Sequence, residues 1–524
     1  MLKRLVVILL SSCFALSCGT QGKVTLSDQK PLTPQLTTEN AEYVVNRPID
    51  LGGKTIVFPK GTTVVFKRNG SFSNGKIVGN ETTLKNPKLN NIRFGGTFLN
   101  AKVTLSDQFD GETDFWGMVQ AFPYAELTLS KDISLPASSV KSINAVQFHL
   151  DGKGHTVAVH RMPILQNTDV QIVNARFDCR DAVERVIYGM GEETNKTFVI
   201  RNCVFTNVPE VSTIIPRAYE DVLIEKCQIS GLLEDKSRSS QKYIYQIRVH
   251  SCTGKVIVRN NTISNCFGAG IAGQYFNPDD NTSVLVENNI IDNVTSGGII
   301  FVSGAVRNAI VRGNRISRTH SHGKQFEGEI DGGPSSAINF HGFNNALVED
   351  NVITDCPNSS SFDFDGSLKG ENRVVKGTGL IVRGNKVTSS GPVAFFAVED
   401  VDVSDNSFEG NIFYSSGAAF FVMGGNNFRM HGNTLTYRQN NGETSYPIYV
   451  KDANDIKSGN VKIDANKITF DGNHYVYVGA NFSGECKIDD NAVLHSGNAR
   501  GTLEVVNKSK SRVQIHNTRT IYKN

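Results

Sequence analysis

The chain has 524 residues, 39% hydrophobic and 20% charged, a composition typical of a globular protein and not of a disordered one. Its formal net charge of +3 is close to neutral for this length and argues against nucleic acid as a partner. It has 48 glycines, a single tryptophan and no long block of helix-forming residues, which indicates mostly β-structure with many turns.

The N-terminus has the pattern of a targeting segment. Lys3 and Arg4 precede a mainly apolar run over residues 5–16, and a small-residue junction follows at Cys18. A cysteine at such a junction resembles the end of a bacterial lipoprotein signal, which implies removal of residues 1–17 and lipidation of Cys18. An ordinary cleaved signal peptide is the alternative.

The lipoprotein resemblance implies a protein anchored in the bacterial cell envelope, at the outer-membrane surface or in the periplasm. The polar run 18–45 would then be a flexible tether. No later apolar run approaches the ~18 residues of a membrane-spanning helix, so the lipid is the only membrane contact that we expect. We also expect the protein to be a monomer.

Residues 46–135 are rich in short β-type segments between glycines, such as Thr55–Phe58, and we interpret them as an N-terminal β-rich cap with the first coils of a solenoid. One short helix is predicted over residues 113–122, because four apolar residues share one face there: Phe115, Met118, Val119 and Phe122. A helix in this place would cap one end of the solenoid.

One phrase recurs along the rest of the chain with a period in the mid-twenties, lengthened in places by loop insertions, which indicates a repeat architecture. It runs apolar, any, apolar, then Asp, Gly or Asn, then Asn, any, apolar and Ser or Thr, as in Ile257–Ser264. The asparagine position holds Cys203 and Cys227 in two early copies, and then Asn261, Asn289, Asn314, Asn351, Asn385, Asn406, Asn433, Asn466 and Asn491.

This phrase fits a short strand, a tight bend and a second strand. Asparagine tolerates left-handed backbone angles and its side chain can bond the backbone at a bend. Stacked at the ~4.8 Å strand spacing, such amides would form a ladder inside an apolar core. The cysteines within the repeats are expected to be buried thiols and not disulfides.

The pattern resembles the right-handed parallel β-helix (pectate-lyase-like) superfamily of secreted bacterial polysaccharide-active proteins, over roughly residues 165–500. The predicted fold is therefore all-β. It is a right-handed parallel β-helix solenoid over residues 136–524, with the N-terminal β cap and one short capping helix. The repeat supplies packing and not chemistry, so it is weak evidence for an activity.

A β-helix binds its ligand along one sheet, through the outward side chains of successive strands. In Tyr245–His250, strict alternation puts Tyr245, Ile247 and Val249 inward and leaves Gln246, Arg248 and His250 outside. The same alignment exposes, in the coils that follow, Gln274, Ile300, Val302, Asn339, His341, Asp363, Asp365, Phe396, Val398, Phe421 and Met423. This sheet would run from a basic end, which includes Arg217, to an acidic pair and an apolar wall.

The most charged insertion of the chain, residues 318–333, would project beside this sheet as one wall of a cleft. Its charged and histidine side chains are Arg318, His320, His322, Lys324, Glu327, Glu329 and Asp331.

A lyase acting on a uronic acid needs a base for the proton beside the carboxylate and a positive group that neutralises the carboxylate. His341 or Lys324 could be the base, with Arg248 and His250 on substrate carboxylates or sulfates; these four are the predicted catalytic group. Further substrate contacts are expected from Arg217, Gln274, Asn339, His320 and His322. A calcium ion could be held by Asp363, Asp365, Glu329 and Asp331.

We therefore predict a polysaccharide lyase that cleaves an acidic, uronic-acid-containing polysaccharide by β-elimination. One alternative is a glycoside hydrolase with Asp363 and Asp365 as acid and base, roughly 6–7 Å apart by the strand rise. The galacturonase-type signature of paired aspartates with a Gly-His-Gly run is absent, and so are the specific pectate-lyase motifs. The other alternative is a glycan-binding or structural β-helix without catalysis.

Overall fold

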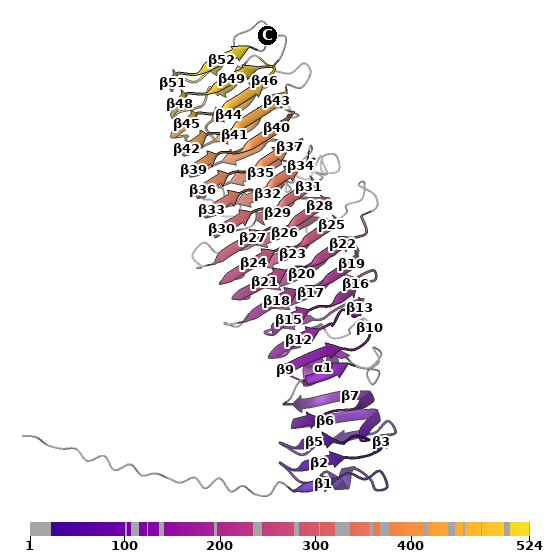
Figure 1. The fold of residues 1–524 in the computed structure, drawn as a ribbon. Coiled ribbons are helices and arrows are strands. Elements are labelled where there is room, and N and C mark those ends of the chain that lie inside the picture. Colours follow the sequence, from indigo (N-terminus) through magenta and orange to yellow (C-terminus); the bar gives the residue numbers. More distant parts are fainter. Residues whose placement is uncertain are drawn as a thin grey trace, which may run out of the picture. The chain divides into compact units, whose positions relative to one another are not determined.

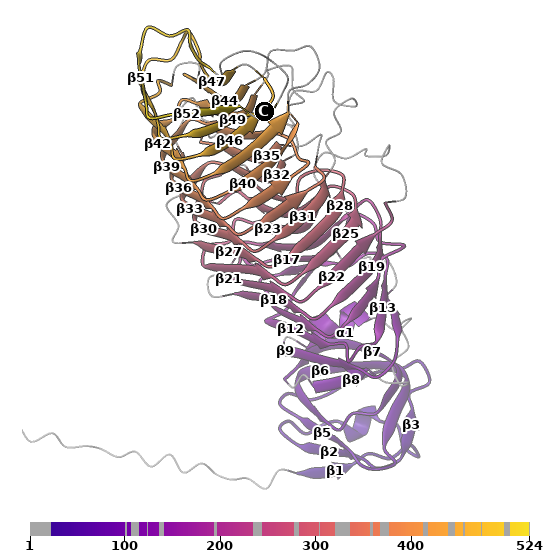
Figure 2. The ribbon, with the colours of Figure 1, turned by 45° about the horizontal axis from the view of Figure 1, so that its top comes forward.

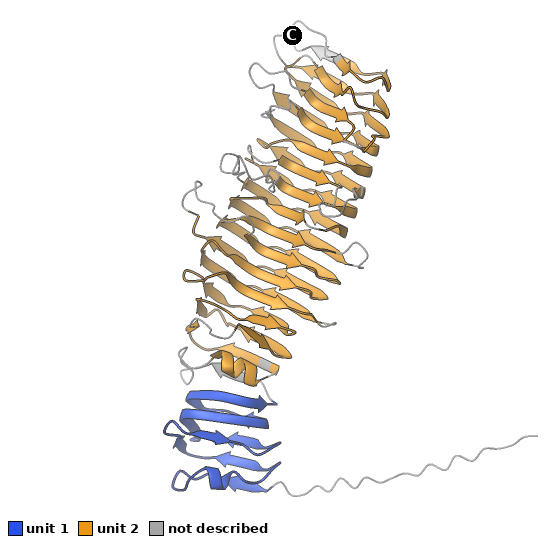
Figure 3. Cartoon of the chain, turned by 180° about the vertical axis from the view of Figure 1, so that it is seen from behind, with its two compact units in different colours: residues 1–100 blue, residues 101–524 orange. Residues whose placement is uncertain are grey.

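The protein is described here from a computed structural model. The residues that it describes are 22–99, 102–105, 115–122, 124–135, 141–192, 196–233, 244–276, 282–302, 304–319, 336–356, 360–366, 377–411, 418–438, 446–453, 456–472, 474–496 and 504–522. The chain forms two compact units, residues 1–100 and residues 101–524, which are coloured separately in Figure 3. Cys18 and the targeting segment lie outside the described residues, so lipidation stays a prediction.

The first unit is a seven-stranded parallel sheet with one turn of 3₁₀ helix, η1 (Thr33–Gln35). Its strands are β1 (Lys23–Thr25), β2 (Glu42–Val45), β3 (Pro48–Asp50), β4 (Thr55–Val57), β5 (Thr63–Phe66), β6 (Ser71–Lys85) and β7 (Leu89–Phe98). Phe58, Phe66 and Phe72 pack together in its core, with Phe66 edge-on to Phe72 at 5.3 Å between ring centroids.

The second unit is a right-handed parallel β-helix, as the sequence predicts. Each complete coil adds one strand to each of three long sheets, which we number I, II and III in the order in which the chain visits them. Figure 1 shows the strands of successive coils of this unit stacked side by side. All strand pairings in the three sheets are parallel among the described residues.

Sheet I has 16 strands: β8 (Lys102–Leu105), β9 (Tyr124–Leu129), β12 (Gln147–Asp151), β15 (Asp169–Val173), β18 (Thr197–Arg201), β21 (Asp221–Glu225), β24 (Lys255–Arg259), β27 (Ser283–Glu287), β30 (Val306–Arg312), β33 (Phe343–Glu349), β36 (Gly377–Arg383), β39 (Val398–Ser404), β42 (Asn426–His431), β45 (Asn460–Asp464), β48 (Glu485–Asp489) and β51 (Arg512–His516).

Sheet II has 15 strands: β10 (Ile133–Leu135), β13 (Thr156–Val159), β16 (Arg176–Asp178), β19 (Val204–Val208), β22 (Gln228–Gly231), β25 (Thr262–Cys266), β28 (Ile290–Val294), β31 (Arg315–Thr319), β34 (Val352–Thr354), β37 (Lys386–Thr388), β40 (Ser407–Asn411), β43 (Thr434–Arg438), β46 (Lys467–Phe470), β49 (Ala492–His495) and β52 (Arg519–Tyr522).

Sheet III has 14 strands: β11 (Ser142–Asn144), β14 (Ile164–Gln166), β17 (Arg185–Met190), β20 (Ser212–Arg217), β23 (Tyr245–His250), β26 (Ala269–Gln274), β29 (Ile299–Val302), β32 (Ser336–His341), β35 (Ser360–Asp365), β38 (Val393–Phe396), β41 (Ala418–Met423), β44 (Tyr446–Lys451), β47 (His474–Val478) and β50 (Glu504–Asn507).

The core of the second unit lies between the three sheets and is built from side chains that repeat from coil to coil. On the inner face of sheet III, successive phenylalanines stack with ring centroids 4.8 to 5.7 Å apart, from Phe301 through Phe340 and Phe364 to Phe395. Offset ring pairs at such separations add stabilisation beyond the area that they bury. The cysteines of the unit, all buried and free, are Cys179, Cys203, Cys227, Cys252, Cys266, Cys356 and Cys486, as expected.

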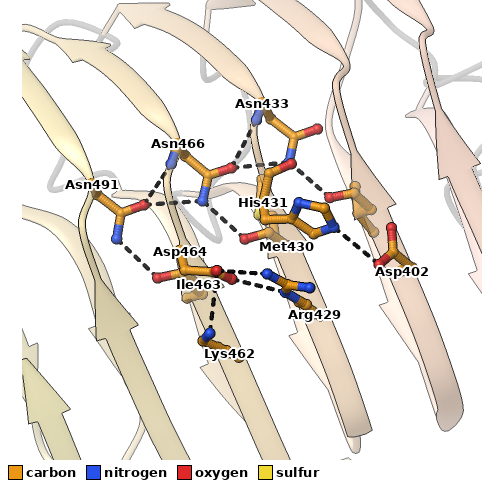
Figure 4. Close-up of polar contacts among 11 residues, drawn as sticks. Asp402, Arg429, Met430, His431, Asn433, Lys462, Ile463, Asp464, Asn466 and Asn491 are labelled. Carbon is orange, nitrogen blue, oxygen red and sulfur yellow. Dashed lines mark hydrogen bonds and ion pairs between the residues drawn. The ribbon is translucent and has the colours of Figure 1, made fainter.

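The predicted asparagine ladder is present at the bend between sheets I and II. Each ladder amide except the last, Asn491, donates to the side-chain oxygen of the next, for example from Asn433 Nδ2 to Asn466 Oδ1 at 2.9 Å (Figure 4). Each also donates to a backbone carbonyl of the preceding coil, as Asn466 does to Met430 at 2.9 Å. The ladder therefore satisfies buried polar groups of three successive coils at once.

One part of the bend prediction is wrong. The ladder asparagine itself does not carry the left-handed backbone; the residue before it does, with φ of 55° at Asn260, 54° at Asp350 and 63° at Gly313. The Asp, Gly or Asn of the recurring phrase thus makes the turn, since these residues tolerate that conformation best. The following asparagine is left to form the hydrogen bonds.

The predicted short helix is present as α1 (Phe115–Ala121), which follows β8 and lies beside the first coils of the second unit (Figure 2). Its apolar face is buried, and the Trp116 ring lies 6.3 Å from that of Phe148 in β12. Within the described part of the chain, no helix is both long and apolar enough to cross a bilayer.

Arginine and glutamate alternate along one edge of sheet I, at the last residue of successive strands. The register pairs Arg201 with Glu225, Glu225 with Arg259, Arg259 with Glu287, Glu287 with Arg312, Arg312 with Glu349 and Glu349 with Arg383. Glu225 is nearly buried, forms an ion pair with Arg201 at 2.6 Å and accepts a hydrogen bond from Arg259 Nε at 2.7 Å. We call this row the Arg–Glu row.

These guanidinium contacts hold the pKa of Glu225 below its usual value despite the opposing effect of burial. A carboxylate with a lowered folded pKa stabilises the fold above its unfolded pKa of ~4.3, and that contribution is lost as the pH falls through the folded value. We expect Glu225→Gln to lower the free energy of unfolding by about 1–2 kcal/mol at pH 7. The difference from the wild type should shrink below about pH 4.

Urea unfolding between pH 3 and pH 7 measures this difference. The matched control is Glu220→Gln, because Glu220 is an exposed carboxylate close in the sequence. A Glu225→Gln deficit that stays constant down to pH 3 would contradict the ionic origin of the effect.

Candidate functional site

The strands of sheet III do not alternate strictly. Their burial pattern is outward, inward, inward, outward, inward, outward, as in Arg185–Met190, where Val186 and Ile187 are both buried. In β23 the same pattern makes Gln246 an inward residue, fully buried, with its Oε1 accepting from Thr213 Oγ1 at 2.6 Å. Tyr245, predicted to be inward, instead lies on the outer side with Arg248 and His250. The predicted orientations of Tyr245 and Gln246 are both wrong for one reason. Two consecutive residues of each strand point inward, so the residues before them have the opposite orientation from strict alternation.

A cleft of about 640 Å³ lies on the outer side of sheet III, across β17, β20 and β23. Its polar and charged lining comprises Glu184, Arg185, Tyr188, Glu210, Ser212, Arg217, Arg248 and His250. The register sets Arg217 directly beside His250 on the neighbouring strand. The structure thus brings the three predicted basic residues, Arg217, Arg248 and His250, into one cleft.

Two of the three arginines that line this cleft, Arg217 and Arg248, differ from those of the Arg–Glu row. Arg185 pairs with Glu184 at 3.7 Å and lies over the Tyr188 ring, 5.0 Å from its centroid. Arg217 and Arg248 have neutral contacts instead: Arg217 Nη1 donates to the Tyr188 hydroxyl at 3.5 Å, and Arg248 Nε donates to Gln274 Oε1 at 2.6 Å. Among the described residues, no carboxylate forms an ion pair with either one. Two positive charges that form no ion pair with a described carboxylate are suited to an anionic ligand.

Arg248 is held in place by its neighbours. Its guanidinium lies 5.5 Å from the centroid of the Tyr245 ring, and Gln274, which accepts from Arg248, donates from Nε2 to the Tyr245 hydroxyl at 3.0 Å. Gln274 was predicted to be exposed and to touch substrate. It is 3% exposed, so it is covered by its contacts and orients Arg248 from beneath.

His250 is a neutral imidazole at neutral pH. Burial lowers its pKa to about 4, and the positive charges of Arg248 and Arg217 act in the same direction. Its Nδ1 lies 2.9 Å from Ser251 Oγ, and its ring lies 4.7 Å from that of Tyr275. These contacts fix the ring and leave Nε2 as the nitrogen that can act on a bound ligand.

The predicted acidic group lies on the same sheet, three to four strands further along. Register pairs Asn339 with Asp363 and His341 with Asp365, so adjacent strands bring these four together as expected. Asn339 Nδ2 donates to Asp363 Oδ2 at 3.0 Å. Asn339 shares the outward register of Arg248 and Asp363 but is only 5% exposed, so the prediction that it is exposed is wrong. None of the four lines the cleft.

The insertion residues His320, His322, Lys324, Glu329 and Asp331 lie outside the described residues, so their predicted roles stay predictions. Within the part of the chain that the structure describes, no cluster of three or more His, Cys, Asp or Glu side chains could hold a metal ion. Calcium at Asp363 and Asp365, with Glu329 and Asp331, is therefore a proposal and not an observation.

Arg185 and Tyr188 were missed by the sequence reasoning, although they line the cleft. The outward alignment began at Tyr245, two coils after them. The signal that could have found them is the segment Arg185–Met190, since it aligns with Tyr245–His250 through two strand pairings.

Comparison with known proteins agrees with this fold. Residues 186–330 match the family model of a right-handed β-helix region. No curated protein sequence matches the chain. The A-module of the mannuronan C-5 epimerase AlgE6 from Azotobacter vinelandii is similar in structure at 11% identity and a TM-score of 0.41, over 79% of this chain and 97% of that chain.

Two further solved structures are similar. An alginate lyase from Paenibacillus sp. matches 58% of this chain and 92% of its own at 11% identity and a TM-score of 0.32. A family 28 exopolygalacturonase from Yersinia enterocolitica matches 74% of this chain and 75% of its own at 10% identity and a TM-score of 0.30. At such values the likeness is one of fold, and the activity has to be argued from this chain's own residues.

Proposed function

For a right-handed parallel β-helix protein with this basic cleft on sheet III, we propose polysaccharide lyase activity: cleavage of an acidic, uronic-acid-containing polysaccharide by β-elimination. The observation that carries the proposal is the pair Arg217 and Arg248, without acidic partners among the described residues, beside the neutral imidazole of His250. The lipid anchor at Cys18 and a place in the bacterial cell envelope belong to the same proposal.

The chemistry assigns one role to each part of the cleft. Arg217 and Arg248 neutralise the uronate carboxylate, which makes the proton on the adjacent carbon more acidic. His250 Nε2 accepts that proton, and its low pKa keeps it unprotonated and ready at neutral pH. The C–H electrons form the new carbon–carbon double bond, and the bond to the glycosidic oxygen breaks. Tyr188, whose hydroxyl contacts Arg217, protonates the leaving oxygen.

This assignment moves the base from His341 or Lys324, the residues first predicted, to His250. His341 lies on β32, three strands from β23, and about 14 Å away at the usual strand spacing. A residue at that distance contacts a different sugar from the one held by Arg248. His341, Asp363 and Asp365 then serve as contacts further along the chain of the substrate.

Hydrolysis by paired carboxylates is the second candidate. Asp363 and Asp365 lie two residues apart on β35, but outside the cleft. The carboxylates in the cleft are Glu184 and Glu210, and Glu184 is engaged by Arg161 at 3.4 Å and Arg185 at 3.7 Å. The cleft therefore supports proton abstraction better than hydrolysis, which needs a carboxylic acid and a carboxylate facing each other.

The test is a panel of acidic polysaccharides: polygalacturonate, alginate, hyaluronan, chondroitin sulfate and heparin. We expect the ultraviolet absorbance of an unsaturated product with at least one of them, and a loss of ~100-fold or more in Arg248→Ala, because a charge that stabilises the transition state is removed. The matched control is Arg176→Ala, an exposed arginine on sheet II. Parallel assays with added calcium and with a chelator test the calcium proposal.

The outcomes separate the candidates. New reducing ends without the absorbance would mean hydrolysis. Retention of a polysaccharide with neither signal would mean a binding protein. Equal activity in Arg248→Ala and Arg176→Ala would remove the cleft from the reaction.

A further inference from the structure

A second group of outward residues lies near the C-terminal end of sheet III, on strands β44 and β47. Three tyrosine rings meet there: Tyr446 and Tyr477 have centroids 4.6 Å apart, and Tyr449 and Tyr477 5.0 Å apart, the latter edge to face. All three are partly exposed. We call Tyr446, Tyr449 and Tyr477 the tyrosine cluster.

The tyrosine cluster occupies the same outward positions as the cleft residues. In β44, Tyr446, Tyr449 and Lys451 stand where β23 has Tyr245, Arg248 and His250, because both strands follow the same outward and inward order. Strand pairing from β23 to β44 crosses seven steps of sheet III. The cluster and the cleft are therefore on one face, ~34 Å apart at the usual strand spacing.

The cluster is closely packed and has one positive charge beside it. The Tyr449 ring lies beside Gly479, where an added Cβ would come within 3.2 Å of its Cε2 atom, so only glycine leaves room for the ring without displacement. Lys451 Nζ lies 5.4 Å from the centroid of the Tyr449 ring. Burial raises the pKa of Tyr446 and Tyr449, so their hydroxyls remain protonated donors at neutral pH.

The aromatic rings and the positive charge of this group are suited to an acidic polysaccharide. Aromatic faces pack against the C–H groups of sugar rings through dispersion and weak C–H contacts with the π electrons. The tyrosine hydroxyls can bond to sugar hydroxyls, and Lys451 can pair with a carboxylate or sulfate. A long chain held at two places on one face gains affinity, because the second contact is intramolecular.

We propose that the tyrosine cluster, with Lys451, is a second binding site for the acidic polysaccharide, which holds the polymer ~34 Å from the cleft. The inference rests on the proposed function for the identity of the ligand. It differs from that function in being non-catalytic and in acting only on chains long enough to reach both places.

The experiment compares wild type with Tyr449→Ala and Tyr477→Ala in affinity gel electrophoresis against the five named polysaccharides. We expect the polymer that wild type retains most strongly to bind each variant roughly tenfold more weakly. Tyr449→Phe should retain most of the affinity, because the ring remains. The control is Tyr124→Ala, an exposed tyrosine of β9 on sheet I.

A second readout separates this inference from the proposed function. Cleavage of tetrasaccharides of the same polymer, too short to span ~34 Å, should be unchanged in Tyr449→Ala and lost in Arg248→Ala. Unchanged polymer retention in both alanine variants, or no retention of any of the five polymers by wild type, would overturn the inference. If the wild type cleaves nothing but retains a polymer that both alanine variants retain more weakly, the tyrosine cluster is upheld and the lyase is refuted.

Discussion

Replacing His250 by alanine is expected to lower the rate of β-elimination about 10³-fold, the usual loss when a positioned general base is removed. Binding of the polysaccharide should change little, because Arg217 and Arg248 remain to hold the carboxylate. The measurement is the initial rate of unsaturated product at saturating polymer, with the dissociation constant measured separately. His516→Ala, an exposed histidine of β51, is the matched control.

The pH profile gives this prediction a second readout. The pKa of His250 is about 4, so the wild-type rate should persist down to about pH 5 and fall only as the imidazole is protonated below that. The charge of Arg248 is one cause of the low value. In Arg248→Met the acid limb should therefore move to higher pH. If both enzymes lose activity at the same pH, another group titrates and His250 is not the base.

Replacing the ladder residue Asn351 by alanine should have the largest effect on stability. Asn351 Oδ1 accepts from Asn314 N at 3.0 Å and from Asn314 Nδ2 at 2.9 Å, and its own Nδ2 donates to Asn385 Oδ1 and Val311 O, both at 2.9 Å. Alanine removes these bonds from buried partners on the two adjacent coils. We expect a loss of about 3–5 kcal/mol in the free energy of unfolding, measured by urea denaturation.

The chain supplies a matched variant for this experiment. Cysteine occupies the ladder position at residues 203 and 227, where the Cys227 backbone N–H donates to Asn261 Oδ1 at 2.9 Å. Asn351→Cys should therefore cost less than Asn351→Ala, since a thiol fills part of the space and bonds weakly. Equal losses in the two variants would contradict this expectation and would mean that neither the volume nor the weak bonds of the thiol replace the lost amide.

The fold could be predicted from the sequence because its determinant is local and repeated. Nine asparagines at one position of a recurring phrase define where each coil turns, and the structure places them in one stack. The helix at Phe115–Ala121 could also be predicted from the sequence, since its apolar residues share one face. The left-handed residue was assigned one position too late, because asparagine is suited to both the turn and the ladder.

The site could be predicted only in part. Alternation is regular near the end of each strand, and it correctly predicts the outward orientation of Arg217, Arg248 and His250. Alternation fails at the start of the strand, because Gln246 turns inward with Ile247 and moves Tyr245 to the outer side. Such an irregularity arises from packing against neighbouring coils and leaves no mark in the sequence of one strand. The burial of Gln274 and Asn339 likewise depends on neighbours from other coils.

The Arg–Glu row also bears on how such a chain can lengthen or shorten. Loss of the single coil that carries Glu287 would set Arg259 against Arg312, two like charges on adjacent strands. Like charges directly opposite destabilise a pair of strands, whereas removal of two successive coils restores an arginine facing a glutamate. Along this row the unit of duplication and deletion that preserves charge pairing is two coils, although the unit of folding geometry is one.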